Sequence, residues 1–254
     1  MYNDNDLIKL IKLSECPRLN EKYKDISGLP LAMPKFELDS PDAFWHVWNR
    51  ELVKVDRQHI DRGAVGVAEP KMHTTHWDGL AMYEDETLLD NAAWRTKVCQ
   101  ELADSQPNYV KSIFELMPFA KIRSIRCWSA HINIPPHFDG NMPTFLDKKM
   151  FFPTEIRIML DDKNPTETFW LCSKEKYQPN SKVPVPLDGR MYVKLPSDTN
   201  TFAWNNENYL HGADFDPKYR KILVVVKGWV DIDRLEALLD ASMVKYPNYV
   251  LREK

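Results

Sequence analysis

Two short segments carry the residues with the clearest capacity for chemistry. The first is Pro135–Gly140, which reads PPHFDG, and the second is Tyr209–Gly212, which reads YLHG. In extended backbone the side chains of His137 and Asp139 share one face, because successive residues point to opposite sides. If His211 arrives from a neighbouring strand, two imidazoles and one carboxylate meet, and this set binds Fe(II) with coordination positions left open. The spacing therefore predicts a metal site made of these three residues.

A second His-x-Asp pattern lies at His76 and Asp78. Its surroundings differ, because no series of strand-like segments frames it and no His-then-Arg pattern follows at comparable spacing. We therefore expect a surface loop or a lid over the site at this position, and the metal pair at His137 and Asp139. His131 precedes His137 on the approach strand, where it either reaches the same cavity or packs in its wall.

The segments that must position these residues change in character along the chain. Before about residue 120 the apolar spacing favours helices, which we expect at 41–60, 88–102 and 109–116, and we expect a helix followed by a loop at 4–25. Ser40 is a candidate N-cap with Pro41 at the first helical position. From residue 121 the apolar residues alternate in short segments separated by Pro, Asn, Asp and Gly, which is typical of strands. After the strand-like segment that begins at residue 121 and leads to His137, the expected strands are 155–160, 168–172, 191–195, 201–204 and 222–230.

The order of these segments predicts the architecture. A mainly helical region at 1–120 precedes a β-rich catalytic core at 121–230, and a closing helix and tail occupy 231–254. Helices that are separate from a run of short strands indicate an α+β fold, here with a small jelly-roll or barrel core. The helical region is expected to pack on that core.

Composition excludes several other classes of protein. The 254-residue chain has a formal charge of −3 and no basic stripe, so it lacks the electrostatic footprint of a nucleic-acid-binding protein. No apolar run is long enough to span a bilayer, and the first residues do not form a secretory signal. The four cysteines form no CxxC pair, which argues against a disulfide framework or zinc module and favours reduced thiols in the cytoplasm.

The motif residues resemble those of the Fe(II)/2-oxoglutarate-dependent oxygenases, over roughly residues 120–230. Within that superfamily, residues 130–137 (AHINIPPH) and the segment from Trp204 to Trp229 are similar to aspartyl/asparaginyl β-hydroxylase-like members. The resemblance implies a double-stranded β-helix, also called a jelly roll. It also implies that His137, Asp139 and His211 are iron ligands.

The resemblance further implies a basic residue, a short distance after the last histidine, that holds the distal carboxylate of 2-oxoglutarate. Arg220 and Lys221 both fall there. Strand alternation puts Lys221 and Lys227 on one face, which we take as the outer face, so that Arg220 points inward. Its planar guanidinium also suits a carboxylate better than an ammonium does. Arg157, in an apolar strand, is a second candidate for 2-oxoglutarate or for an acidic group on the substrate.

The implied reaction is hydroxylation of an unactivated C–H bond in a small substrate, an amino acid or related metabolite. It would consume 2-oxoglutarate and O2, release succinate and CO2, and benefit from ascorbate as a supporting reductant. Asp139 stands where the aspartyl-hydroxylase branch has glycine, so the carboxylate completes the triad and argues against halogenation. The alternatives are a hydroxylase of a protein or peptide side chain, a cupin-like metalloenzyme that needs no 2-oxoglutarate, and a non-catalytic jelly-roll protein. The substrate, the carbon oxidised and the oligomeric state remain open at this point.

Overall fold

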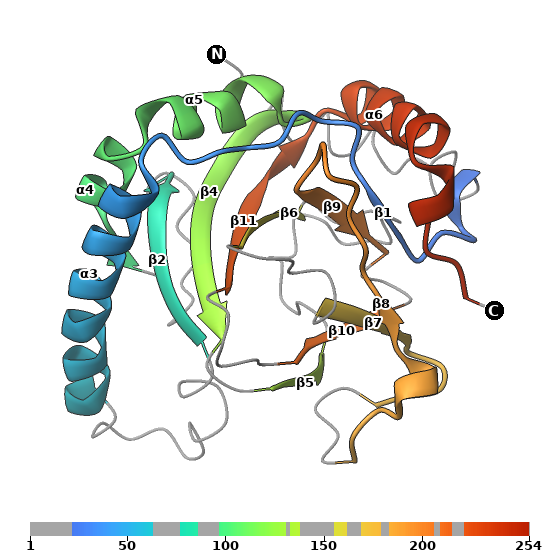
Figure 1. Ribbon diagram of the computed structural model, residues 1–254, viewed down its shortest axis with the longest axis horizontal. Coiled ribbons are helices and arrows are strands. Elements are labelled where there is room, and N and C mark those ends of the chain that lie inside the picture. The colour runs from blue at the N-terminus through green and yellow to red at the C-terminus, as the bar shows by residue number, and fades with distance from the viewer. Residues whose placement is uncertain are drawn as a thin grey trace.

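Two β-sheets form the centre of the molecule (Figure 1). The computed structural model describes residues 22–62, 77–85, 97–130, 133–137, 155–161, 169–178, 183–205, 209–214 and 221–253. The strands of the larger sheet are β1 (Gly28–Pro30), β2 (Trp77–Glu84), β3 (Lys97–Val98), β4 (Phe119–Ala130), β6 (Glu155–Asp161), β9 (Thr201–Trp204) and β11 (Lys221–Val230). Those of the smaller sheet are β5 (Ile134–His137), β7 (Phe169–Ser173), β8 (Met191–Tyr192) and β10 (Tyr209–Ala213).

The strand orders show how the chain moves between the sheets. Within the described residues the larger sheet runs β1-β9-β6-β11-β4-β2-β3 and the smaller one runs β5-β10-β7-β8. All pairings are antiparallel except that of β2 with β3. From β4 onward the chain therefore passes repeatedly from one sheet to the other, with β4, β6, β9 and β11 in the larger sheet and β5, β7, β8 and β10 in the smaller. Together with the helices, this confirms the predicted α+β class.

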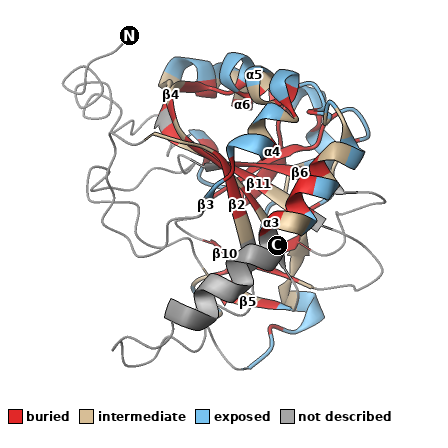
Figure 2. Ribbon diagram, turned by 90° about the vertical axis from the view of Figure 1, so that its left-hand side faces the viewer, coloured by how far each residue is buried: buried red, intermediate tan, exposed pale blue. Residues whose placement is uncertain are grey.

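Helices cover one face of the larger sheet, which we call its outer face. They are α3 (Pro41–Arg62), α4 (Gln100–Asp104), α5 (Pro107–Leu116) and α6 (Ile232–Lys245). The sheet contributes Ile158, Val224 and Val226 to the main apolar cluster, and the helices contribute residues such as Phe44 and Leu239 to the same cluster. Figure 2 shows the consequence, because burial is concentrated in the strands whereas the outward sides of α5 and α6 are exposed.

The opposite face of the larger sheet, which we call the inner face, is turned toward the smaller sheet. A second apolar cluster joins the two sheets there, and its members are Ile134, Met159, Phe169, Leu171, Val193, Phe202, Trp204, Tyr209 and Ala213. Met159 and Leu223 lie on the inner face, whereas their strand neighbours Ile158 and Val224 lie on the outer face. The site residues must be sought in this space between the sheets.

Several predicted elements are confirmed. The helix expected at 41–60 is α3, and the backbone N–H of Ala43 donates to Ser40 Oγ at 3.3 Å, as expected for an N-cap. The helix expected at 109–116 is α5. The strand expected at 201–204 is β9, and the closing helix is α6. In the described part of the chain, no helix is long and apolar enough to cross a bilayer.

The expectation of a mainly helical region before residue 121 is wrong in one respect. β1, β2 and β3 belong to this region, and all three are strands of the larger sheet. In the segment 88–102, Lys97–Val98 is a strand and only the part from Gln100 is helical within the described residues. The helix expected at 4–25 lies almost wholly outside the described residues.

Candidate active site

Two of the three predicted metal ligands lie side by side. β5 and β10 are neighbours in the smaller sheet, and His137 and His211 are direct partners in their register. Their ring centroids are 4.1 Å apart, with the rings tilted by 49°. His211 is buried, with 3% of its surface exposed. The structure thus brings together two imidazoles that are far apart in the sequence, and their proximity suits a shared metal ion.

The ring of His211 is held by aromatic neighbours between the sheets. Phe169 of β7 stacks on it with centroids 5.6 Å apart, and Trp204 of β9 lies 5.0 Å away. On the other side of β10, a Cβ on Gly212 would lie only 2.3 Å from the Trp170 ring. Only glycine fits there without displacing Trp170, so packing on both sides of β10 directs His211 into the space between the sheets.

His137 has a hydrogen bond that orients its ring. Its Nδ1 lies 2.9 Å from the backbone oxygen of Pro135. A carbonyl oxygen can only accept, so this contact assigns a proton to Nδ1, and in the neutral ring Nε2 then carries the lone pair. Neutral imidazole held in this way is the form in which histidine binds a metal, and a backbone carbonyl is a common partner of the other ring nitrogen. The donor set therefore fits a metal ion.

Arg157 supplies a buried positive charge on the facing sheet. Its residue is 7% exposed, and its guanidinium carbon lies 5.2 Å from the centroid of the Trp204 ring. The same Trp204 ring contacts His211. One indole therefore links the guanidinium to the histidine pair, and the position suits an anion bound beside the metal.

Other predicted site residues lie outside the described residues: Asp139, Arg220, His76 and His131. Asp139 as the third ligand and Arg220 as the favoured 2-oxoglutarate anchor therefore stay predictions. Among the residues that are described, no group of three or more His, Cys, Asp or Glu is placed to hold a metal. Asp78 is described at the level of its backbone, which lies in β2 opposite Ser129. The expectation of a loop or lid at Asp78 is therefore wrong.

The expectation that the face of β11 with Lys227 is its outer face is wrong. That face also carries Leu223, which packs against the cluster between the sheets, and Val225, which is fully buried. Ile222 and Val224 instead belong to the main cluster on the helix side. Arg220 remains a prediction, but it no longer has this argument in its favour.

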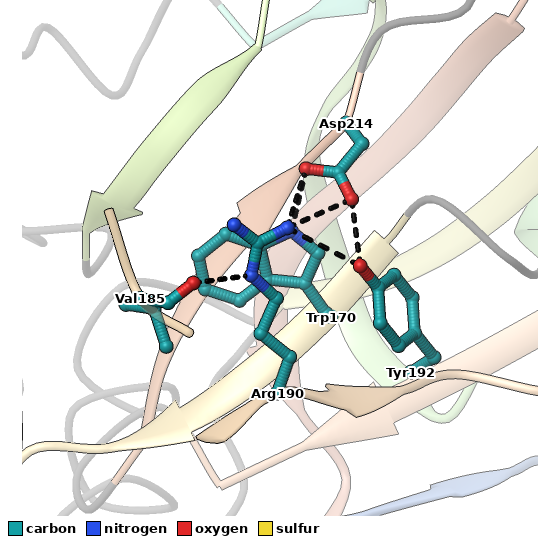
Figure 3. Close-up of polar contacts among 5 residues, drawn as sticks. All are labelled: Trp170, Val185, Arg190, Tyr192 and Asp214. Atoms are coloured by element: carbon teal, nitrogen blue, oxygen red, sulfur yellow. Dashed lines mark hydrogen bonds and ion pairs between the residues drawn. The ribbon is translucent and has the colours of Figure 1, made fainter. Parts of the chain in front are cut away.

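A polar cluster on the far side of the smaller sheet was not anticipated from the sequence (Figure 3). The Asp214 carboxylate accepts hydrogen bonds from Arg190 Nη1 at 2.9 Å to each oxygen, from the Tyr192 hydroxyl at 2.7 Å and from Trp170 Nε1 at 3.2 Å. Arg190 Nε donates to the Val185 carbonyl at 2.8 Å, and the guanidinium stacks 4.7 Å from the Trp170 ring centroid. We call these residues the Asp214 clamp.

The Asp214 clamp joins three strands of the smaller sheet. Asp214 directly follows β10, whereas Tyr192 belongs to β8 and Trp170 to β7. Asp214 also comes three residues after His211. The clamp therefore anchors the end of the strand that carries the buried histidine. The only signal in the sequence is a set of polar residues near strand ends, which does not reveal their convergence.

Comparisons with known proteins match solved structures only. No family model matches the chain, and no curated protein matches it. One similar structure is a prolyl hydroxylase in complex with a hypoxia inducible factor oxygen degradation domain peptide fragment from Trichoplax adhaerens, at 10% identity and a TM-score of 0.38, covering 93% of this chain and 97% of that one. Another is an oxidoreductase of the 2OG-Fe(II) oxygenase family from Burkholderia pseudomallei, at 11% identity and a TM-score of 0.35. The match covers 91% of this chain and 94% of that one. A third is the Fe(II)/(alpha)ketoglutarate-dependent dioxygenase TqaL, at 9% identity and a TM-score of 0.35. The match covers 90% of this chain and 91% of that one.

Proposed function

We propose that the chain is an Fe(II)- and 2-oxoglutarate-dependent dioxygenase that hydroxylates an unactivated C–H bond of a small substrate, an amino acid or related metabolite. The observation that carries the proposal is the direct pairing of His137 with His211 on adjacent strands. The buried Arg157, one indole ring away, adds the positive charge that an anionic co-substrate needs.

The strand connections support a double-stranded β-helix as the core of this enzyme. Four strands from β4 onward lie in the larger sheet and four in the smaller, all within the described residues, and the chain crosses between the sheets several times. The orders β9-β6-β11-β4 and β5-β10-β7-β8 give two antiparallel layers with an apolar cluster between them. Such a jelly roll places side chains from both layers in one interior, which is where the histidine pair lies.

The metal would be held by His137 through Nε2, by His211 and by Asp139. Imidazole nitrogen together with a carboxylate oxygen is a donor set that Fe(II) accepts, with positions left for co-substrate and O2. When bound, the iron, 2-oxoglutarate and O2 supply the oxidising power for hydroxylation, with succinate and CO2 as co-products. The protein contributes the fixed tautomer of His137 and the aromatic wall of Phe169 and Trp204, which keeps water away from His211.

Arg157 is the residue to which we assign the distal carboxylate of 2-oxoglutarate. The Arg157 residue is only 7% exposed, and two parallel N–H groups of its guanidinium match a carboxylate. The Trp204 ring fixes its position by stacking. Arg220 stays the second choice, on the resemblance alone. Ascorbate is proposed only as a reductant that sustains turnover.

Two finer assignments complete the proposal. Within the superfamily we place the chain near the aspartyl/asparaginyl β-hydroxylase-like branch, on the sequence of residues 130–137. We also place it in the cytoplasm, and the free thiols of Cys99, Cys127 and Cys172 are compatible with a reducing compartment.

The test is succinate release from 2-oxoglutarate by the purified protein with Fe(II), ascorbate and O2, with and without pooled amino acids and metabolites. His137→Ala and His211→Ala should abolish iron-dependent succinate. His46→Ala is the matched control, because His46 is exposed on α3 and should leave the rate unchanged. Wild-type protein that neither binds Fe(II) and 2-oxoglutarate nor releases succinate would refute the proposal.

The role of Arg157 needs its own measurement. Arg157→Gln should raise the apparent KM for 2-oxoglutarate at least tenfold while kcat falls much less, because the co-substrate would lose its anchor and not its reacting end. Arg234→Gln is the control, since Arg234 lies on α6 and bonds backbone carbonyls of Glu115 and Leu116. If 2-oxoglutarate binds Arg157→Gln as tightly as it binds the wild type, the anchor lies elsewhere and Arg220 is the next residue to replace.

A further inference from the structure

A second arginine, Arg126, lies on the inner face of the larger sheet. It is on β4, on the other side of β11 from Arg157. In the register of the larger sheet, Arg157 of β6 pairs with Val225 of β11, and Val225 pairs with Arg126 of β4. Paired residues on adjacent strands project from the same face of a sheet. The two arginines are therefore on the same face, about 10 Å apart at Cα, which is two strand spacings.

Arg126 forms an ion pair within this face. Its Nη2 donates to Glu84 Oε1 of β2, and Glu84 pairs in register with Ser124 of β4. The side chains of Arg126 and Glu84 are only 17% and 16% exposed. Opposite charges are thus held together at a partly buried position on the same face as the candidate active site.

Within the part of the chain that the structure describes, two polar atoms of this group have no hydrogen-bond partner. They are Arg126 Nε and Ser124 Oγ, and both are buried. Ser124 is 1% exposed, and strand alternation places it on the same face as Arg126. A buried polar group that is left without a hydrogen-bond partner destabilises the folded state. Both atoms therefore favour a ligand that brings a hydrogen-bond acceptor to this position.

We propose that Glu84, Ser124 and Arg126 form the substrate subsite, and that it takes the α-carboxylate and α-ammonium groups of a free amino acid. The carboxylate would accept from Arg126 Nε–H and from the Ser124 hydroxyl, and the ammonium would donate to the Glu84 carboxylate. A zwitterion adds no net charge to the Arg126–Glu84 ion pair, whereas a purely anionic or purely cationic ligand would leave a net charge at this partly buried position. The inference rests on the proposed function, because it names the substrate of that same inter-sheet site.

Binding is the direct test. Each of the common amino acids would be titrated by calorimetry into the wild-type protein, and so would its N-acetyl methylamide, which lacks both free charges. Arg126→Gln/Glu84→Gln removes both charges, and Arg126→Glu/Glu84→Arg keeps an ion pair but reverses its direction. Thermal unfolding of each variant shows whether it is folded at the temperature of the titration.

The chain offers a matched control on the other side of the sheet. Lys121 and Asp85 also form an ion pair between β4 and the end of β2, at 2.9 Å. It lies beside Tyr83, whose ring packs against Phe114 of α5, so it belongs to the helix-covered side. Lys121→Gln/Asp85→Asn should therefore leave amino-acid binding unchanged.

We expect at least one free amino acid to bind the wild type, and its Kd to rise tenfold or more in both the neutral and the reversed variant. No binding of any free amino acid, or equal binding by the reversed variant, would overturn the subsite. Equally tight binding of an N-acetyl methylamide would overturn it in favour of a peptide side chain. If 2-oxoglutarate and Fe(II) still bind in those cases, only this inference fails. If they do not bind either, the proposed function fails with it.

Discussion

Replacement of Asp214 by alanine should destabilise the smaller sheet and weaken metal binding at His211. The carboxylate is the centre of the Asp214 clamp, and it accepts hydrogen bonds from Arg190, Tyr192 and Trp170. Without it, the Arg190 guanidinium, whose side chain is 14% exposed, loses its counter-charge. The end of β10 would then be held mainly by its backbone ladder, three residues beyond His211.

The size of the effect follows from burial. Breaking a fully buried ion pair from one side costs about 3–5 kcal/mol, because a charge is left uncompensated. The Asp214 side chain is 32% exposed, so solvent screens part of this, and we expect a loss of about 2–3 kcal/mol in the free energy of unfolding. Asp214→Asn keeps an acceptor oxygen but loses the charge, so its cost should be smaller, about 1–2 kcal/mol.

Urea unfolding followed by far-UV circular dichroism measures these losses, and titration with Fe(II) in the absence of denaturant measures the effect on the site. Glu115→Ala is the control, because Glu115 forms an exposed pair with Lys111 at i,i+4 and should change stability by less than about 0.5 kcal/mol. A stability loss for Asp214→Ala no larger than that of the control would refute the clamp. A large stability loss with unchanged Fe(II) affinity would refute its link to His211.

Three further changes have defined outcomes. Gly212→Ala should cost about 1–3 kcal/mol and weaken Fe(II) binding, since its Cβ would meet the Trp170 ring at 2.3 Å, and urea unfolding and metal titration check both effects. Burial raises the pKa of the Cys172 thiol to about 11, so at pH 8 only about 0.1% of it is thiolate, and peptide mapping should find it unmodified by iodoacetamide until the protein is unfolded. Ile158→Ala, at a fully buried position on the helix side, should lower the free energy of unfolding by about 2–5 kcal/mol in urea, and no measurable loss would contradict the assigned core.

The histidine pair could be predicted from the sequence because the pattern around each of the two histidines is local. The prolines before His137 forbid a helix, so extended backbone is expected there, and His211 is expected to arrive from a neighbouring strand. Their contact then requires only that the two strands be neighbours, which the order β5-β10 in the smaller sheet confirms. The third ligand, Asp139, stays a prediction.

The strand β2 escaped prediction for a physical reason. Its residues Trp77–Glu84 do not alternate cleanly, because the register with β4 shifts between Ala81 and Tyr83. At that bulge two successive residues, Met82 and Tyr83, both pack toward the main cluster. An extra residue of this kind removes the period of two on which strand recognition depends.

Apart from the histidine pair, contacts between strands that are far apart in the sequence could not be predicted. Arg157 meets Trp204 because β9 lies beside β6, and strand order is a property of the whole sheet. The same holds for Asp214 and Arg190, which look like ordinary polar residues at strand ends. Local patterns therefore predicted which residues lie on strands, and the sheet order decided which of them meet.

The wrong assignment of the β11 faces follows from the layering of the molecule. Counting charges identifies the outer face of a strand only when that face meets water, as in a sheet with one solvated side. β11 lies between the helices and the smaller sheet, so Val224 on one face and Val225 on the other are both fully buried. Lys227 is only partly exposed and shares the face of Val225. A long lysine side chain can leave such a face at the open end of a strand, so its presence does not mark the whole face as solvated. On a strand that is buried on both sides, the most deeply buried charged side chain therefore identifies the face of the site. Within the described residues, Arg157 of the neighbouring strand β6 is that side chain on the face of Val225.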